Sequence, residues 1–434
     1  MQKIYYSKNM ESLKKKVFVL FFSIASFCFA DENIVELSLD DAVKNAMKNN
    51  VSIKQSEISL DAKKRGADYS WNSISPSVSG TGRYSKNIPG SSDDKASLSA
   101  GISLSASLSP SVYTSAKDAE LSYSYQQSLY QNELRSVELD VRKNYYYLLY
   151  KAEEISLKEK SLETSKNQYE SNLAKYKRGT LSRLDVFSAQ VSYQNDQLEL
   201  KSLNAEVENS IASFKQLVGI PQDTEIRLSG SFENILNLKD ISIDGMEFNS
   251  FSVESLQKQI DSAKNSLLAS RFSSYGPSIS ASYSYNYSSV DGGSSWDDNG
   301  TLSLQASIPL DGFLPWSSGA LDVQSKKDSV KSLELELEDA KTSLEVNVST
   351  LMNKINQCLE NIDLRKSSIE LAQTTYEMTL ESYNHGTKDM LSLQTAMDNL
   401  LSAKVNLISE GYNLICAVLD LENAAGIPFG TLEN

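Results

Sequence analysis

The residue types that most often carry out chemistry are scarce in this sequence. Its 434 residues include a single histidine, His385, directly before Gly386-Thr387. One histidine excludes a multi-histidine metal site within one chain, and a position beside a turn favours a turn residue over a catalytic base. The patterns G-x-x-x-x-G-K-[ST], G-x-S-x-G and Cys-x-x-Cys are all absent. We therefore expect no catalytic residues, no cofactor and no metal site. The chain is not expected to be an enzyme.

The N-terminal residues 1–30 are predicted to be a secretory signal peptide. A basic segment at 14–16 precedes an apolar run at 17–29 that is too short to span a bilayer as a helix, and Ala30 offers a cleavage site. The alternative is acylation of Cys28, which the bulky residue before it disfavours. The other two cysteines, Cys358 and Cys416, lie in helical segments and are expected to be small core residues.

The chain is acidic. Its net charge is −14, and removal of the five Lys and one Glu of residues 1–30 takes it to −18. This charge argues against nucleic acid as a partner, because nucleic-acid binders carry basic faces. No segment beyond the signal peptide is apolar for 18 residues, so we expect either a protein that is soluble outside the cytoplasm or one that crosses a membrane with strands.

One helical hairpin occurs twice, at an offset of 207 residues. Tyr-x-x-Gly-Thr stands at 176–180 and again at 383–387, and Gly-Ile-Pro stands at 219–221 and again at 426–428. Each copy predicts a long helix, a tight break at Tyr-x-x-Gly-Thr and a helix that runs back. A period of this length indicates a duplicated half of a domain rather than a short repeat.

Three segments, one in the first half of the chain and two in the second, alternate apolar with polar or small residues, mostly Ser, at period two. The apolar positions are Leu98, Ala100, Ile102, Leu104, Ala106 and Leu108, and then Ile279, Ala281, Tyr283, Tyr285 and Tyr287 followed by Leu302, Leu304, Ala306, Ile308 and Leu310. Such alternation over about ten residues is typical of outer-membrane strands. The alternative, a half-buried soluble hairpin, would more often place Lys, Glu or Thr on the polar face. We expect the acidic tips at 90–94 and 293–298 to face the extracellular side.

Apolar residues recur every seven positions along two long helical segments and their returning partners. They are Leu134, Val141, Leu148, Ile155, Leu162, Tyr169 and Tyr176, then Val186, Tyr193, Leu200, Val207 and Phe214, and in the second copy Val348, Ile355, Ile362, Ile369, Tyr376 and Tyr383, then Leu393, Leu400, Leu407, Leu414 and Leu421. Sustained heptads predict coiled-coil packing. About 60 helical residues at 1.5 Å each give a rod of roughly 90–100 Å.

Shorter elements precede each hairpin. Ser38 or Asp40 is expected to cap a helix that runs to about 69–71, and its counterpart spans roughly 253–272. A short strand is expected at 224–228.

Taken in order, these segments resemble the TolC-like outer-membrane efflux protein family over residues 34–428. The resemblance rests on the order and spacing of Leu37-Ser38-Leu39-Asp40-Asp41-Ala42, the two strand pairs, the two Tyr-x-x-Gly-Thr breaks and the two Gly-Ile-Pro ends. It implies an α+β membrane protein in which a homotrimer forms a 12-strand outer-membrane β-barrel, continuous with a periplasmic α-helical barrel. Four strands per chain leave open edges, so closure by other chains is also expected on physical grounds.

The expected domains follow the duplication. Residues 1–30 are the signal peptide, 31–221 the first repeat, 222–247 an irregular equatorial connector, 248–428 the second repeat and 429–434 a C-terminal tail. Within the repeats we expect β-hairpins at about 75–109 and 276–311, and helical hairpins at about 115–218 and 319–425.

The resemblance also implies two sets of site residues at the helix tips. Adaptor docking is expected at Arg178-Gly179-Thr180 and His385-Gly386-Thr387, although a plain turn would need the same glycines. A periplasmic gate is expected to use Asp185, Tyr383 and Lys388, and a solvated charge is the alternative for the ionic pair. Ser392 and Thr395 occupy positions where the family's best-known member has aspartate rings, so a constriction of that kind is in doubt.

The function implied is that of an outer-membrane exit duct of a tripartite efflux pump or a type I secretion system. Its partners would be two further copies of the chain, a periplasmic adaptor (membrane fusion protein), outer-membrane lipid and, indirectly, an inner-membrane pump of RND or ABC type. The alternative is a secreted periplasmic coiled-coil scaffold or adaptor without a barrel.

Overall fold

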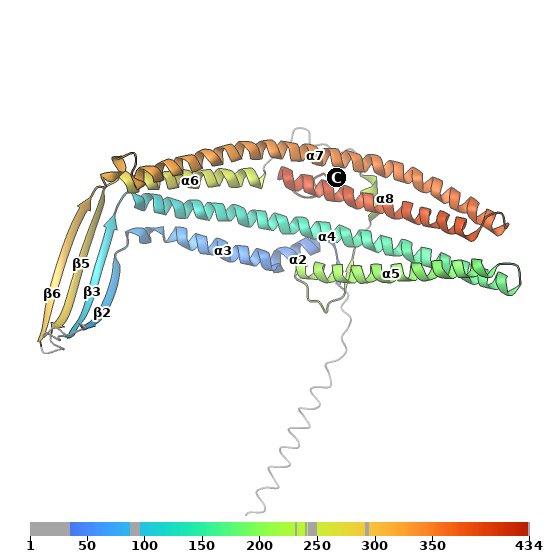
Figure 1. Cartoon of the computed structure of the whole chain (residues 1–434), viewed down its shortest axis with the longest axis horizontal. Coiled ribbons are helices and arrows are strands. Elements are labelled where there is room, and N and C mark those ends of the chain that lie inside the picture. The colour runs from blue at the N-terminus through green and yellow to red at the C-terminus, as the bar shows by residue number, and fades with distance from the viewer. Residues whose placement is uncertain are drawn as a thin grey trace, which may run out of the picture. The chain divides into compact units, whose positions relative to one another are not determined.

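The described residues of the computed structural model fall into several stretches. They are 35–86, 96–230, 232–238, 241, 250–290 and 295–432. The predicted signal peptide with Cys28 and Ala30, the acidic segment 90–94 and nine of the 26 residues of the connector 222–247 lie outside them. The described part is mostly helical, with a smaller share of strand (Figure 1).

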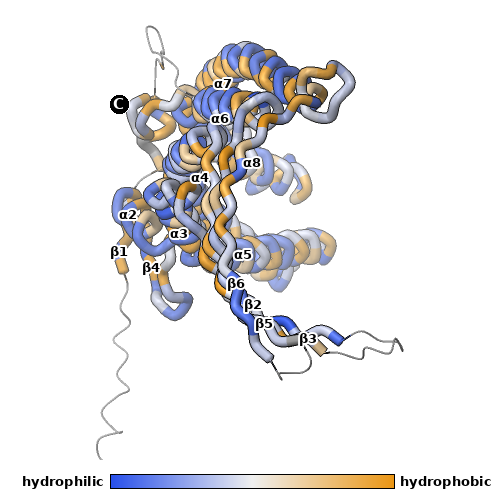
Figure 2. Tube along the Cα trace, turned by 90° about the vertical axis from the view of Figure 1, so that its left-hand side faces the viewer, coloured by the Kyte–Doolittle hydropathy of each residue, from blue (hydrophilic) through white to orange (hydrophobic). Residues whose placement is uncertain are grey.

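The chain forms two compact units. We call residues 35–50, 141–234 and 369–408 the tip unit, and residues 51–140, 235–368 and 409–432 the sheet unit. Two long helices, α4 (Ser111–Lys177) and α7 (Ser318–Asn384), have residues in both. Hydrophilic and hydrophobic residues alternate along the helices, as heptads require (Figure 2).

A four-stranded antiparallel sheet belongs to the sheet unit. Its strands are β2 (Ser77–Lys86), β3 (Ala96–Leu108), β5 (Ser278–Val290) and β6 (Ser295–Ser307), in the order β2-β3-β5-β6 (Figure 1). The two predicted hairpins are thus joined into one sheet through β3 and β5. In the described part of the chain, β2 and β6 each pair with one strand only.

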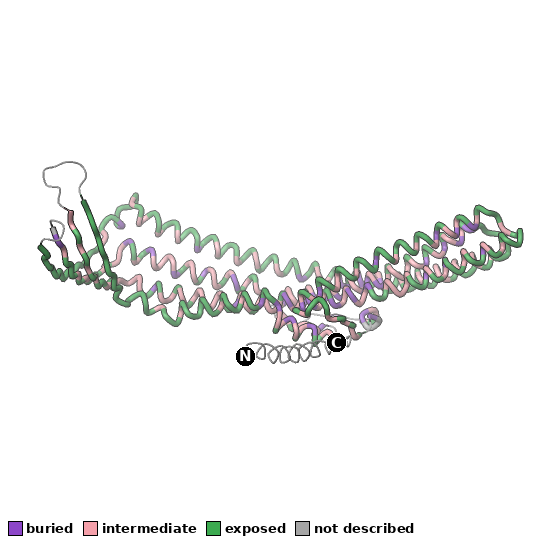
Figure 3. Tube along the Cα trace, turned by 90° about the horizontal axis from the view of Figure 1, so that it is seen from below, coloured by how far each residue is buried: buried purple, intermediate pink, exposed green. Residues whose placement is uncertain are grey.

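The two faces of this sheet differ sharply because the pairing keeps like residues opposite each other. Leu104 lies opposite Tyr283, which lies opposite Leu302, so one face is apolar. The other face is rich in serine, and hydroxyls meet across the strands at 2.7–2.9 Å in the pairs Ser77–Ser105, Ser79–Ser103, Ser85–Ser97 and Ser278–Ser307. Both edge strands are exposed along their whole length (Figure 3).

Helices support the sheet within the same unit. α3 (Val51–Asp68) leads through the short η1 (Ser70–Ile74) to β2, and η3 (Asp311–Phe313) leads from β6 to α7. α6 (Phe251–Tyr275) is tied to α4 by Asn265 Nδ2, which donates to the Thr114 carbonyl at 2.9 Å, and to α7 by a hydrogen bond from Ser270 to Asp322 at 2.6 Å. Among the described residues, no helix combines the length and apolarity needed to cross a membrane.

The end of α8 (Met390–Ala425) is the most deeply buried part of the sheet unit. Glu422 is fully buried, and its carboxylate accepts the N–H groups of Gly430 and Leu432 at 2.9 and 2.8 Å. Arg135 of α4 donates to the carbonyls of Glu422 and Ile427. The C-terminal segment is therefore folded back and held by hydrogen bonds to a buried carboxylate.

A break at Asn50 divides the first helical segment, which the sequence had predicted to run unbroken to about 69–71. α2 (Leu39–Asn49) is capped by Ser38, and Asn50 then leaves helical angles with φ −59° and ψ 135°. Its Nδ2 donates at 2.9 Å to the carbonyl of Leu217, near the end of α5 (Arg183–Val218). The break thus satisfies a carbonyl that the end of α5 leaves without a helical partner.

Two short elements pair beside this break. β1 (Val35–Leu37) runs parallel to β4 (Ile226–Leu228), the strand expected at 224–228, and the 3-10 helix η2 (Phe232–Asn237) follows. The Tyr145 hydroxyl of α4 donates to the Leu37 carbonyl at 3.1 Å and fixes this pair to the tip unit.

The end of α5 carries one of four helix-terminating glycines. Gly219 has φ +75°, and the next N–H, that of Ile220, donates to the Lys215 carbonyl at 2.9 Å. Glycine enters this left-handed conformation at little cost, and this pair of features defines a Schellman helix end. A Cβ at Gly219 would lie 2.5 Å from the Cβ of Asn49.

We predict that Gly219→Ala destabilises the protein more than Gly179→Ala. Both glycines have nearly the same positive φ, +75° and +77°, so both substitutions bear a similar backbone cost of about 1–2 kcal/mol. A Cβ at position 219 would also collide with Asn49, whereas a Cβ at position 179 meets nothing within 4 Å. Overpacking therefore adds about 1–3 kcal/mol to the destabilisation by Gly219→Ala alone. Urea unfolding of the detergent-solubilised variants measures the difference; equal losses would contradict this packing.

Candidate functional site

The first helix tip joins α4 to α5. Gly179 has φ +77°, and the Thr180 N–H donates to the Lys175 carbonyl at 3.0 Å. The Thr180 hydroxyl donates to the same carbonyl at 3.0 Å, and Arg178 Nε donates to the Ala174 carbonyl at 3.3 Å. Gly179 and Thr180 therefore both take part in terminating α4, which is the role that a plain turn would give them.

The second tip joins α7 to α8 and repeats this geometry. Gly386 has φ +75°, and both the N–H and the hydroxyl of Thr387 donate to the Ser382 carbonyl at 2.9 Å. His385 Nε2 lies 4.0 Å from a carboxylate oxygen of Glu381, one turn earlier, and both side chains are exposed. Within the described residues, no group of His, Cys, Asp and Glu side chains is placed to hold a metal ion.

The returning helices start with different caps. In α5, Ser182 Oγ accepts the Asp185 N–H at 3.2 Å and donates to the Asp185 carboxylate at 2.6 Å, so the N-cap side chain is bonded to Asp185 in both directions. In α8, Asp389 itself caps the helix and accepts the Ser392 N–H at 2.9 Å. Hydrogen bonding from Ser392 holds the pKa of Asp389 below its usual value. Lys388 is exposed beside this cap.

Thr395, the last of the predicted gate positions, follows one turn into α8. Its hydroxyl donates to the Leu391 carbonyl at 2.9 Å. The side chain is exposed and neutral, so it brings no charge to the tip.

A buried polar cluster lies between the two tips. Asn172 of α4 is fully buried, and its Oδ1 accepts hydrogen bonds from the Tyr383 hydroxyl at 2.9 Å and from Gln168 Nε2 at 3.0 Å. Its Nδ2 lies 3.7 Å from the Met390 sulfur. Burial raises the pKa of Tyr383. The Tyr383 hydroxyl is thus hydrogen-bonded inside its own chain, and a link to another chain stays a prediction.

An apolar shell surrounds this cluster. Its members come from all four helices of the tips: Tyr169, Ala189, Tyr376, Leu380, Tyr383, Met390 and Leu393. The sequence analysis missed Asn172, although it stands three residues after Tyr169, at the second core position of the same heptad. Inspecting both core positions of each heptad would have found it.

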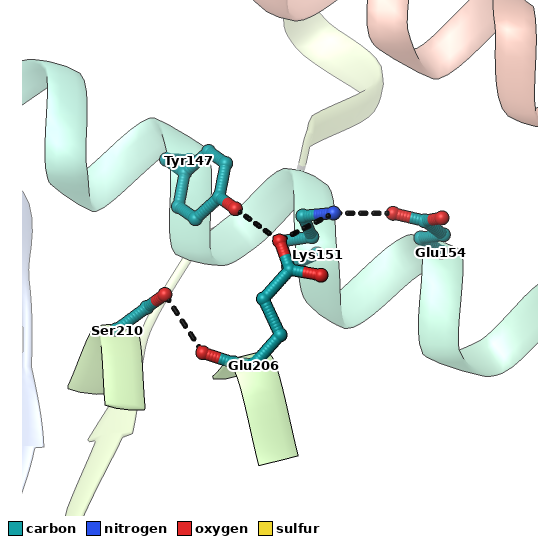
Figure 4. A network of polar contacts seen from close by, with 5 residues as sticks. All are labelled: Tyr147, Lys151, Glu154, Glu206 and Ser210. Carbon is teal, nitrogen blue, oxygen red and sulfur yellow. Dashed lines mark hydrogen bonds and ion pairs between the residues drawn. The ribbon is translucent and has the colours of Figure 1, made fainter. Parts of the chain in front are cut away.

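An ion network around the buried Lys151 joins α5 to α4 farther from the tips (Figure 4). Lys151 Nζ lies 3.0 Å from Glu154 and 3.1 Å from Glu206, and Glu206 also accepts from the Tyr147 hydroxyl at 2.7 Å. Burial lowers the pKa of Lys151, but the hydrogen bonds to both glutamates outweigh it and raise that pKa above its ordinary value. The hydrogen bonds from Tyr147 and Lys151 lower the pKa of Glu206.

Two features of this geometry recur in known proteins, the duplicated helical hairpin and the strand pair that precedes each of its copies. A family model described as outer membrane efflux protein matches residues 42–220 and 245–427, most of the chain. The chain belongs to the outer membrane efflux protein family. Both matched segments contain one strand pair and one helical hairpin.

Solved structures of outer-membrane channels have the same fold as this efflux protein. The Campylobacter jejuni channel CmeC matches with a TM-score of 0.72 and 16% identity, over 89% of this chain and 85% of its own. CusC matches at 0.69 and 14%, over 91% and 94%. The Neisseria gonorrhoeae channel MtrE, in its open state, matches at 0.66 and 17%, over 90% and 89%. A search of curated proteins gave no match.

Membership of the outer membrane efflux protein family decides between the expected functions. The protein is an exit duct for efflux in the outer membrane, it acts in transport, and it is not an enzyme. The scaffold without a channel is not favoured, because the whole duplicated unit of strands and helices matches the family.

We predict that Lys151→Met lowers the free energy of unfolding by about 3–5 kcal/mol, because it leaves Glu154, whose side chain is only 13% exposed, without its cation. Lys158→Met is the matched control one heptad later: its partner Glu199 is largely exposed, so the loss should not exceed about 1 kcal/mol. Urea unfolding measures both. Similar losses for the two variants would show that the Lys151 network does not fix the hairpin.

Proposed function

We propose that three copies of this chain close into one duct, with twelve strands in the outer membrane and the helices around a periplasmic tunnel. The observation that carries this proposal is the sheet. Its apolar face is exposed, with Leu302 79% accessible, its other face is lined by serine, and neither edge strand has an outer partner among the described residues. An apolar face toward lipid, a polar face toward water and edges paired with other copies meet the requirements of a membrane-spanning sheet.

Exposed heptad stripes on the helices support the same assembly. Leu184, Val191 and Leu198 of α5 are seven residues apart and 55–74% exposed. A second stripe of the same spacing lies on α7, with exposures of 65–71%, at Leu364, Leu371 and Met378. Apolar residues at this spacing are typical of a coiled-coil seam, so we infer that each stripe packs against another copy of the chain.

The domain boundaries follow from this arrangement. We propose that residues 31–221 and 248–428 are the two repeats that build the wall, with strand pairs and helical hairpins at the bounds given above. Residues 222–247 would form a belt around the middle of the helices, and the pairing of β4 with β1 supports this connector role. Residues 429–434 would be the C-terminal tail.

The tips are proposed to be the regulated end of the duct. In this proposal Arg178-Gly179-Thr180 and His385-Gly386-Thr387 dock a periplasmic adaptor, through which an inner-membrane pump of RND or ABC type delivers cargo. Exposed polar side chains around two identical turns support this role. Asp185, Tyr383 and Lys388 would hold neighbouring tips together, with Ser392 and Thr395 lining the closed end; the open state named for MtrE supports a gate.

Conductance in planar bilayers tests this proposal. The purified protein should form channels of low conductance, and the double variant Asp185→Ala with Lys388→Ala should raise the conductance at least severalfold because the ionic link between copies is lost. Asp41→Ala is the matched control, because Ser38 and Asp41 make the same two cap hydrogen bonds, of 2.6 and 3.2 Å, at the start of α2 and outside the tips.

The outcomes separate two parts of the proposal. If the wild-type protein forms no channel, the duct itself is refuted. If channels form but the double variant conducts like the wild type and Asp41→Ala, these residues do not take part in closure.

A further inference from the structure

A pocket of about 220 Å³ lies in the tip unit, where α4, α7 and α8 meet. Its lining consists of Leu157, Lys160, Ser161, Thr164, Gln373, Tyr376, Met397, Leu400, Leu401 and Lys404. Pockets for drug-sized ligands measure about 300–1,000 Å³, so this one admits a smaller molecule, with a single ring or a short chain.

The pocket lining is basic, although the chain as a whole is acidic. The sequence has 56 acidic and 42 basic residues, yet the lining contains two lysines, Lys160 and Lys404, and no carboxylate. In the described part of the chain, neither ammonium group has an ion-pair partner, in contrast to Lys151 and Lys158 nearby. Two unpaired cations at one pocket favour an anionic ligand.

A buried hydroxyl adds a hydrogen-bond donor to this wall. Ser161 is only 8% exposed, and its Oγ has no hydrogen-bond partner within the protein. Buried polar groups in folded proteins almost always have a partner, so an unpaired one beside a pocket points to a ligand atom. Thr164 differs, because its hydroxyl already donates to the Lys160 carbonyl at 2.8 Å.

Most of the remaining lining is apolar and is contributed by three leucines, Met397 and the ring of Tyr376, whereas the amide of Gln373 is polar and already donates to Glu377 at 2.7 Å. Burial raises the pKa of Tyr376, which keeps its phenol neutral and the wall free of negative charge. An inorganic anion would leave this surface unused, whereas a ring or short alkyl chain would cover it.

We propose that this pocket binds a small amphipathic carboxylate. The carboxylate would lie between Lys160, Lys404 and the Ser161 hydroxyl, and the apolar part would pack on the leucines, Met397 and Tyr376. Aromatic acids of the size of benzoate and short fatty acids of the size of octanoate have this chemistry. The site is separate from the tip residues, and its existence does not depend on the duct proposal.

Isothermal titration of the full-length protein in detergent tests this site with benzoate and octanoate. Lys160→Gln with Lys404→Gln should weaken binding at least tenfold, because both cations are lost. Lys166→Gln is the matched control: this lysine is exposed on α4 outside the lining, and its removal should leave the affinity unchanged. Benzamide, which has the same ring without the charge, should bind at least tenfold more weakly than benzoate.

Ser161→Ala provides a second test that does not risk the fold, because it removes one oxygen atom. It should weaken benzoate binding about ten- to a hundredfold, the loss of one hydrogen bond to a charged group. The proposal is overturned if the folded protein binds neither acid, if the double lysine variant binds benzoate as tightly as Lys166→Gln does, or if Ser161→Ala binds it as tightly as the wild type.

Discussion

Unpaired backbone groups along the edges of one sheet set the main constraint on this protein. β2 and β6 each have a neighbour on one side only in the described part of the chain, and both strands are exposed. Water satisfies such edges on a soluble protein, but in lipid each unsatisfied N–H or C=O costs several kcal/mol. The same strands carry an exposed apolar face, which suits lipid and not water. A single chain in a membrane cannot meet both requirements, and the proposed assembly with further copies would meet them by pairing the edge strands.

The long helices also carry apolar residues that a single chain covers only in part. Heptad residues such as Val141, Ile355 and Leu414 are buried within the chain, whereas the stripe that begins at Leu184 is not. Polar groups then make the packing specific: Asn172 and Lys151 each join two helices and are satisfied on several sides. Such buried polar groups fix the register of coiled coils better than apolar contacts alone.

Local patterns made much of this fold predictable from the sequence. The alternation of Leu and Ser identified the strands because side chains in a sheet alternate at period two, and the Gly-Thr pairs identified the tips because αL turns need glycine. The break at Asn50 and the Asn172 cluster escaped prediction because they depend on distant partners: Asn50 contacts a residue 167 positions away, and Asn172 one 211 positions away. Of the predicted site residues, the local roles of Thr180 and Asp185 follow from spacing, whereas links between tips depend on how the copies are arranged.

Strand pairing between copies is the most direct test of this account. We would place one cysteine at Ser79 on β2 and one in turn at Thr301, Ser303 or Gln305 on β6, all on the serine face, in a chain with Cys358→Ser and Cys416→Ser. Oxidation in isolated outer membranes, followed by denaturing electrophoresis, reports the crosslinks. The account predicts that one β6 position gives linked species of two and three chains and nothing larger. Monomers alone at every position, or a ladder that continues beyond three chains, would contradict it.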